Sequence, residues 1–144
     1  MTKELFETAV KDGRPVCYYL FRDLGLGKDC KYFVETGTHE GHSVQFALDL
    51  GFEEILSCEF MTDRYTGCMN RFSNNDNVSL WCGTSIDSLP GMLEQIDKRS
   101  CFWLDAHDEG GGVPTFEELS LIKEHSIKDH TCLLYTSPSP RDRG

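Results

Sequence analysis

The sequence predicts an α/β protein with a Rossmann-like fold, in which helices cover both faces of a mostly parallel, doubly wound sheet. Two features support this prediction. Short apolar runs alternate with helical stretches of roughly ten residues over most of the chain, which is the pattern of repeated βαβ units. Glycine or polar and acidic residues follow the apolar runs. In a parallel sheet these residues meet at one edge, where ligands of such folds bind.

The strands are expected where short apolar runs end at turn residues or polar residues. The first begins at Lys31 and ends ahead of Gly37, and the third is closed by Gly83. The fourth is the most apolar and leads into Asp105. The five predicted strands are residues 31–35, 54–59, 78–82, 101–105 and 131–135.

The helices are expected where apolar residues recur at helical spacing. Two precede the first strand, over residues 1–12 and from Pro15 to Leu24. The others cover residues 44–50, 63–72, 84–96 and a stretch that begins near Thr115. Thr84 is expected to cap its helix and Thr115-x-x-Glu118 to form a capping box. Pro90 is expected to split or kink the helix that contains it.

The chain is expected to form a single domain over residues 1–135, with its N-terminal helices in residues 1–27. Residues 136–144 are polar and rich in proline, without an apolar period, so this tail is expected to be disordered. It also stands where a loop and a further helix should follow the fifth strand. The tail is therefore interpreted as foreign to the fold, with a native flexible tail as the alternative.

Composition narrows the classes of partner. The formal net charge of −10 argues against nucleic-acid and membrane-surface roles, which need a basic face. No apolar run is long enough to span a membrane, and no apolar secretory segment follows the N-terminus. The seven cysteines lack a Cys-x-x-Cys pair and are read as reduced core thiols. A cytoplasmic protein without a structural metal is expected.

The most informative loop runs from Glu35 to Gly41, after the first strand. Gly37 and Gly41 allow a tight turn and a close approach to a ligand. The helix that follows offers free N–H groups at its start. Glu35 stands two residues before the first glycine, where a carboxylate would repel a pyrophosphate but attract a cationic amine. The spacing therefore favours the amino-acid end of S-adenosylmethionine over a dinucleotide.

Two further strand ends add to this pocket. Glu59 ends the second strand, where an acid can bind the ribose hydroxyls of an adenosine ligand. Phe60 follows it and can lie against adenine. Gly83, Thr84 and Ser85 form a small-residue turn after the third strand, where an adenine edge can meet backbone groups.

Taken in order, these segments resemble class I S-adenosylmethionine-dependent methyltransferases. The segments are Phe33 to Gly41, Glu59, Gly83-Thr84-Ser85 and Phe102 to His107, and they are most similar to the FkbM-like and related small-molecule methyltransferases. The resemblance covers roughly residues 30–135 and implies a fold of seven strands, of which about five are present. It implies that Glu35, Gly37, Thr38 and Gly41 hold the methionine part, and that Glu59 holds the ribose. It further implies that Thr84 and Ser85 lie near adenine.

Asp105 and His107 are the candidates for chemistry, because both follow the fourth strand. Histidine can act as a general base on an acceptor hydroxyl, since its pKa lies near working pH. Asp105 can orient it, bind the cofactor amine or bind a divalent ion. The expected reaction is methyl transfer to a small-molecule or sugar hydroxyl. Because the resemblance implies further strands, the chain as given is expected to be inactive or poorly stable.

Three other interpretations stay open. An oxidoreductase with a dinucleotide fits the same fold, although Gly-x-Gly-x-x-Gly is absent. The chain can also be a non-catalytic domain that binds a nucleoside weakly. Asp105-Ala106-His107-Asp108 is similar to the metal-binding run of ureohydrolases, but Glu109 departs from that pattern and the other metal motifs of that family are not evident.

Overall fold

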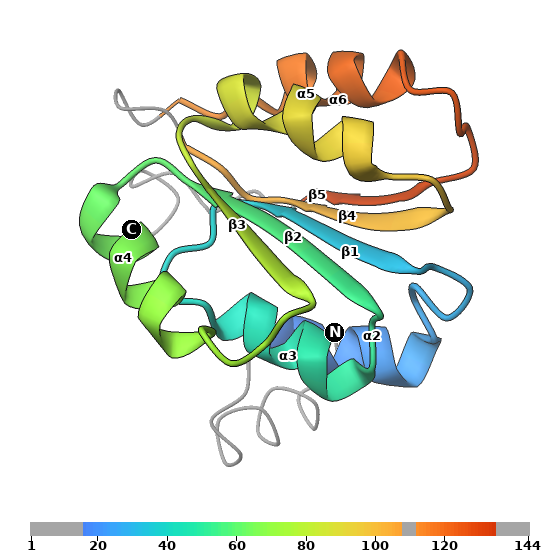
Figure 1. The fold of residues 1–144 in the computed structure, drawn as a ribbon. Helices are drawn as coiled ribbons and strands as arrows, with labels where there is room; N and C mark the ends of the chain where they lie inside the picture. Colours follow the sequence, from blue (N-terminus) through green and yellow to red (C-terminus); the bar gives the residue numbers. More distant parts are fainter. Residues whose placement is uncertain (1–15, 108–111, 135–144) are drawn as a thin grey trace, which may run out of the picture.

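The computed structural model describes residues 16–107 and 112–134. It confirms the predicted fold class: five parallel strands form one sheet in the order β3-β2-β1-β4-β5, with helices on both faces (Figure 1). The strands are β1 (Tyr32–Thr36), β2 (Glu54–Glu59), β3 (Val78–Cys82), β4 (Ser100–Leu104) and β5 (Thr131–Leu134). The helices are α2 (Val16–Leu24), α3 (His42–Leu50), α4 (Thr62–Arg71), α5 (Ser85–Gln95) and α6 (Thr115–Lys123).

The sheet separates two hydrophobic cores because neighbouring side chains of a strand point to opposite faces. Val34 of β1 packs with Leu56 and Phe102 beneath α5 and α6. Phe33, its neighbour, packs on the other face, which α2, α3 and α4 cover (Figure 1). All five residues of β1 are buried, as the central position of that strand in a covered parallel sheet requires.

The point at which the strand order reverses lies between β1 and β4. The chain moves outward from β1 to β2 and β3, and then returns to place β4 on the free side of β1. The backbone N–H of Asp105, just after β4, donates to the carbonyl oxygen of Thr36 at 3.1 Å. Such a reversal opens a crevice at the carboxyl ends of the strands.

Two predictions about helix α5 have different outcomes. The Thr84 cap is confirmed, because its side chain accepts a hydrogen bond from the backbone N–H of Asp87 at 3.2 Å. The predicted split at Pro90 is wrong, since α5 runs without interruption through that residue. Buried Leu89 and Met92 hold the helix against the sheet on both sides of the proline.

The capping box predicted for α6 is also wrong. Pro114 occupies the N-cap position, so Thr115 falls one residue inside the helix and makes no capping hydrogen bond. Glu118 turns inward instead and is only 1% exposed.

Several sequence predictions concern residues that the structure does not describe. These are the helix at residues 1–12, the end of the fifth strand at Tyr135 and the tail at residues 136–144. Within residues 16–107 and 112–134, no helix has the length and apolar character that crossing a membrane requires.

Candidate functional site

The loop between β1 and α3 is held against the ends of its neighbouring strands. The N–H groups of Gly37 and Thr38 both donate to the carbonyl oxygen of Cys58, at 2.9 and 3.0 Å. Gly37 has a φ of 88°, and a Cβ atom there would lie 2.7 Å from the carbonyl oxygen of Asp105. A glycine is required at this position because the backbone after β4 approaches it, whether or not a ligand does.

Glu35 lies beneath this loop and is buried. Its Oε1 accepts a hydrogen bond from the Ser57 hydroxyl at 2.8 Å, and the Ser57 hydroxyl lies 2.6 Å from that of Thr38. Burial raises the pKa of Glu35 to about 8, although Ser57 and Ser43 oppose the rise. The carboxyl group therefore supports the glycine loop from below and holds its proton up to neutral pH.

Glu59 fixes the other side of the same loop. Its Oε1 accepts from the backbone N–H of His39 at 2.8 Å, and its Oε2 accepts from that of Met61 at 2.9 Å. The residue is 3% exposed and lines a cavity. A carboxylate with one backbone donor on each oxygen keeps further acceptor positions for a ligand.

The cavity at the carboxyl ends of the strands has a volume of about 150 Å³. It brings together six residues that the sequence predicted for the site: Gly37, Glu59, Phe60, Gly83, Ser85 and His107. His39, Cys58, Met61, Arg64 and Ala106 complete its lining. A second hollow of about 310 Å³ adjoins it through Ser85 and His107 and adds Thr84, Ile86, Val113, Pro114 and Glu117.

Four predicted residues do not line either hollow. Glu35 and Thr38 are buried below the loop, and Gly41 begins α3. A Cβ atom at Gly41 would lie 2.7 Å from the ring of Phe72, so this glycine also serves packing within the protein. Asp105 lies beside His39 and His107, at 3.9 Å from each ring.

Asp105 lies between two histidines. Its Oδ2 is 3.9 Å from Nε2 of His39, and its Oδ1 is 3.9 Å from Nε2 of His107. Burial raises the pKa of Asp105, and the two histidines oppose that rise. The cluster therefore places the carboxyl group of Asp105 near His107, the histidine that the sequence predicted as a general base.

His39 is a site residue that the sequence reasoning missed. It is the only non-glycine residue with positive φ in the described chain, at 53°, a strained conformation that is enriched at functional sites. Its Nδ1 lies 3.1 Å from Nη1 of Arg64. Because arginine only donates, Nδ1 is the acceptor and Nε2 carries the proton toward Asp105. No local pattern shows this, since Arg64 and Asp105 come from distant segments.

Buried polar atoms without partners gather at the same edge. Among the described residues, the buried side-chain atoms without a hydrogen bond are Ser85 Oγ, Arg99 Nε, Asp105 Oδ1 and Glu118 Oε1. Three of these four lie at the carboxyl edge. The Ser85 hydroxyl faces the carboxyl group of Glu118 without completing a hydrogen bond to it. Burial raises the pKa of Glu118, and the nearby hydroxyls of Ser85 and Thr36 oppose the rise. Unpartnered groups of this kind are expected where a ligand completes the hydrogen bonding.

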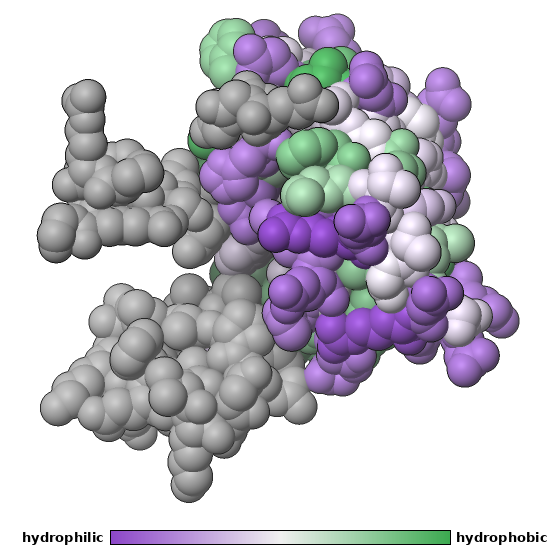
Figure 2. All heavy atoms as spheres, turned by 90° about the vertical axis from the view of Figure 1, so that its left-hand side faces the viewer, coloured by the Kyte–Doolittle hydropathy of each residue, from purple (hydrophilic) through white to green (hydrophobic). Residues whose placement is uncertain are grey.

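The face that carries this edge is shown in Figure 2, where hydrophilic side chains surround a small hydrophobic area. The described residues contain no group of three side chains that could hold a metal ion. Asp108 and Glu109, which belong to the ureohydrolase-like run, lie outside the described residues.

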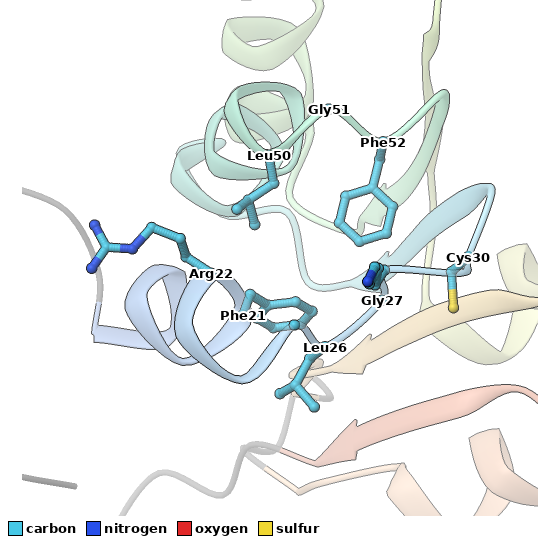
Figure 3. Close-up of a pocket in the computed structure, with 10 residues that line it drawn as sticks. Phe21, Arg22, Leu26, Gly27, Cys30, Leu50, Gly51 and Phe52 are labelled. Atoms are coloured by element: carbon cyan, nitrogen blue, oxygen red, sulfur yellow. The ribbon is translucent and has the colours of Figure 1, made fainter.

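A third hollow, of about 290 Å³, lies away from this edge, between α2 and the end of α3 (Figure 3). Phe21, Leu26, Leu50 and Phe52 provide much of its lining. The guanidinium of Arg22 points away from it and pairs with Asp23 at 2.7 Å. This hollow offers few polar groups for chemistry, so the carboxyl edge is the stronger candidate.

Solved structures with a similar fold include methyltransferases. The O-methyltransferase TomG from Streptomyces achromogenes, in complex with S-adenosylmethionine, matches with a TM-score of 0.65 at 14% identity, over 93% of this chain and 65% of its own. The Podospora anserina methyltransferase PaMTH1, bound to S-adenosylhomocysteine, matches with a TM-score of 0.62 at 16% identity, over 81% of this chain and 49% of its own. The chain thus spans about half to two thirds of their length. No model of a protein family matches it, and no curated protein does.

Proposed function

We propose that the chain binds S-adenosylmethionine at the carboxyl edge of its sheet and serves methyl transfer to a small-molecule or sugar hydroxyl. The observation that carries this proposal is the placement of Glu59. Its carboxylate ends β2, is held by two backbone N–H groups and lines the cavity together with Gly37 and Ser85. This is the place where an acid binds the hydroxyls of an adenosine ribose.

The residues at this edge fit such a ligand. Ser85 Oγ and Asp105 Oδ1 are buried polar atoms without partners, which suit the amines and hydroxyls of a nucleoside and an amino acid. Ser85 and Thr84, with Gly83 and Phe60, would hold adenine. Gly37, Thr38 and Gly41 would present the start of α3 to the carboxylate of the methionine part. Glu35 would support the glycine loop from below, through Ser57.

The proposed reaction requires few catalytic groups from the chain itself. The ligand supplies an electrophilic methyl group on a sulfonium, so the protein mainly has to position the acceptor and remove its proton. We assign the proton to Nδ1 of His107, because this residue lines both hollows and its Nε2 faces Asp105 Oδ1 at 3.9 Å. Asp105 would orient this ring and stabilise its charged form. Exclusion of water by the apolar part of the cavity, Phe60 and Met61, would protect the reaction.

An oxidoreductase with a dinucleotide is the second candidate, because Glu59 would also bind the ribose of that ligand. The charge at the edge favours the methyltransferase. Glu59 lines the cavity and Asp105 lies beside His107, so a pyrophosphate would meet carboxyl groups there instead of donors.

Calorimetric titration with S-adenosylhomocysteine, NAD and adenosine in parallel tests the proposal. We expect the first to bind most tightly. We expect Glu59→Gln to weaken its binding about 10- to 100-fold, the effect of a lost hydrogen bond to a charged group. Glu40→Gln is the matched control, since Glu40 is an exposed acid of the same loop. Binding of NAD without S-adenosylhomocysteine, or unchanged affinity in a folded Glu59→Gln variant, would contradict the proposal.

A further inference from the structure

Two histidines join three elements at the amino edge of the sheet, opposite the proposed site. His125 lies in the connection between α6 and β5, and His130 lies just before β5. Nε2 of His130 is 3.1 Å from Nδ1 of His125. Nε2 of His125 is 3.1 Å from the carbonyl oxygen of Leu93 in α5, and the backbone N–H of Ser100 in β4 donates to Nδ1 of His130 at 3.0 Å.

The backbone donors determine where both protons lie. The N–H of Ser100 requires a bare Nδ1 on His130, so the proton of the neutral ring is on Nε2. The N–H of Ile127 donates to Nδ1 of His125 at 3.3 Å, so that nitrogen is also bare. His130 therefore donates to His125, and His125 donates through Nε2 to Leu93. All four ring nitrogens are used, and both rings are neutral.

A further proton has no place in this arrangement. On His130 it would face the N–H of Ser100, and on His125 it would face two N–H donors. The charged groups that face His130 are His125, Asp129 beside it, and Arg99 from the turn before β4. Burial lowers the pKa of His130, His125 and Arg99 add to that effect, and Asp129 opposes it.

We propose that His125 and His130 form an acid-sensitive clasp, in which uptake of one proton below about pH 6.5 breaks the chain of hydrogen bonds and releases the α6–β5 connection from β4 and α5. The clasp does not depend on the function proposed above. Release of the clasp would also affect the carboxyl edge, because His125 follows α6 and α6 places Glu118 near the proposed site.

The direction of the pH effect follows from linkage. An unfolded histidine binds a proton near pH 6.5, whereas burial lowers the pKa of His130 in the folded clasp, so the unfolded state holds more protons as the pH falls. The unfolding equilibrium constant should therefore rise up to about tenfold per pH unit below pH 6.5.

Urea unfolding of the whole chain between pH 5 and 7.5 tests this. In the His130→Asn variant, the unfolding equilibrium constant should lose most of the rise at acid pH that the clasp causes. The asparagine oxygen can still accept from the N–H of Ser100, but the side chain cannot reach His125. His42→Gln is the control, since His42 is an exposed histidine of α3, and it should keep the rise. If His130→Asn retained the full wild-type pH dependence, the proposal would be overturned.

Two NMR measurements on the unmodified chain do not depend on a variant. The ¹⁵N shifts of both rings should show Nε2–H tautomers at pH 7.5, and the N–H of Ser100 should lose protection from exchange below pH 6. The N–H of Lys31, which donates to Arg99 O at 3.0 Å, is the internal reference. An Nδ1–H tautomer on His130, or its titration at or above pH 6.5, would contradict the clasp.

Discussion

The two edges of the sheet differ in how completely their polar groups are paired. At the amino edge, the histidine clasp uses every ring nitrogen, and the hydroxyl of Tyr32 donates to Asp97 at 2.7 Å. At the carboxyl edge, Ser85, Asp105 and Glu118 each keep a buried atom without a partner. Each such atom costs about 1–3 kcal/mol. Arg99 Nε is the exception at the amino edge.

This difference is the one we expect if the proposed ligand binds at the carboxyl edge while the amino edge serves stability. Parallel strands bring their polar ends together without any need for a ligand, so the clustering alone is weak evidence. The lack of partners at the clustered groups is stronger evidence, because a purely structural edge would be expected to pair them. Three tests, taken from the largest expected effect to the smallest, probe the contrast.

The glycines of the two edges give the largest expected effect. Gly37 and Gly51 have nearly the same φ, 88° and 89°. A Cβ atom at Gly37 would lie 2.7 Å from a backbone oxygen, whereas one at Gly51 has nothing within 4 Å. We expect Gly37→Ala to lower the free energy of unfolding by about 3 kcal/mol, and Gly51→Ala by about 1 kcal/mol. Urea unfolding measures both free energies. Equal losses of stability would contradict the close contact between a Cβ atom at Gly37 and the Asp105 carbonyl oxygen.

Glu35→Gln should raise stability above the pH at which an ordinary glutamate ionises. The pKa of Glu35 is about 8 in the folded chain against an ordinary value of 4.5. The folded state therefore holds more protons between these values, and wild-type stability falls as the pH rises through that window. A neutral glutamine removes this loss, so the variant should be more stable than wild type by about 1–3 kcal/mol at pH 8 and by little at pH 4.5.

The measurement for Glu35→Gln is the difference in unfolding free energy between variant and wild type from pH 4.5 to 8. S-adenosylhomocysteine titration of the same variant at pH 7 should show nearly unchanged binding, because glutamine resembles the protonated acid and its oxygen can still accept from Ser57. A difference that does not grow with pH would mean that Glu35 is ionised in the folded protein.

Two buried serines give the smallest expected effect. Ser100 donates from Oγ to the carbonyl oxygen of Lys98 at 2.9 Å, whereas Ser85 Oγ has no partner. Ser100→Ala should cost about 1 kcal/mol, and Ser85→Ala should be neutral or slightly stabilising. Thermal unfolding measures both. A loss at Ser85 as large as that at Ser100 would mean that Ser85 is paired in solution.

The sequence predicted the described strands closely because each is a short apolar run with a clear end. The strand predicted at residues 54–59 matches β2, and those predicted at 31–35 and 101–105 differ from β1 and β4 by one residue. Gly37, Glu59, Ser85 and His107 were identified as site candidates because they follow these strands directly, and the structure places all four on one cavity.

What the sequence did not predict depends on tertiary contacts. Pro90 lies in a helix that packing holds together, and Glu118 turns inward to meet Ser85 and Thr36. His39 gains its role from Arg64, which is distant in the sequence. The proton arrangement of His125 and His130 depends on two backbone donors whose positions no pattern indicates.

The strand order also has a consequence for how the chain folds. β1, β2 and β3 follow one another in sequence and in space, and each neighbouring pair is joined by a single helical crossover, through α3 or α4. β4 must instead return to the centre, where Ser100 pairs with Tyr32. Closing so long a loop costs entropy before any contact repays it. We therefore expect the β1–β2–β3 half to form early and the β1–β4 pairing to limit the folding rate, so that the crevice at the reversal is completed only in that late step.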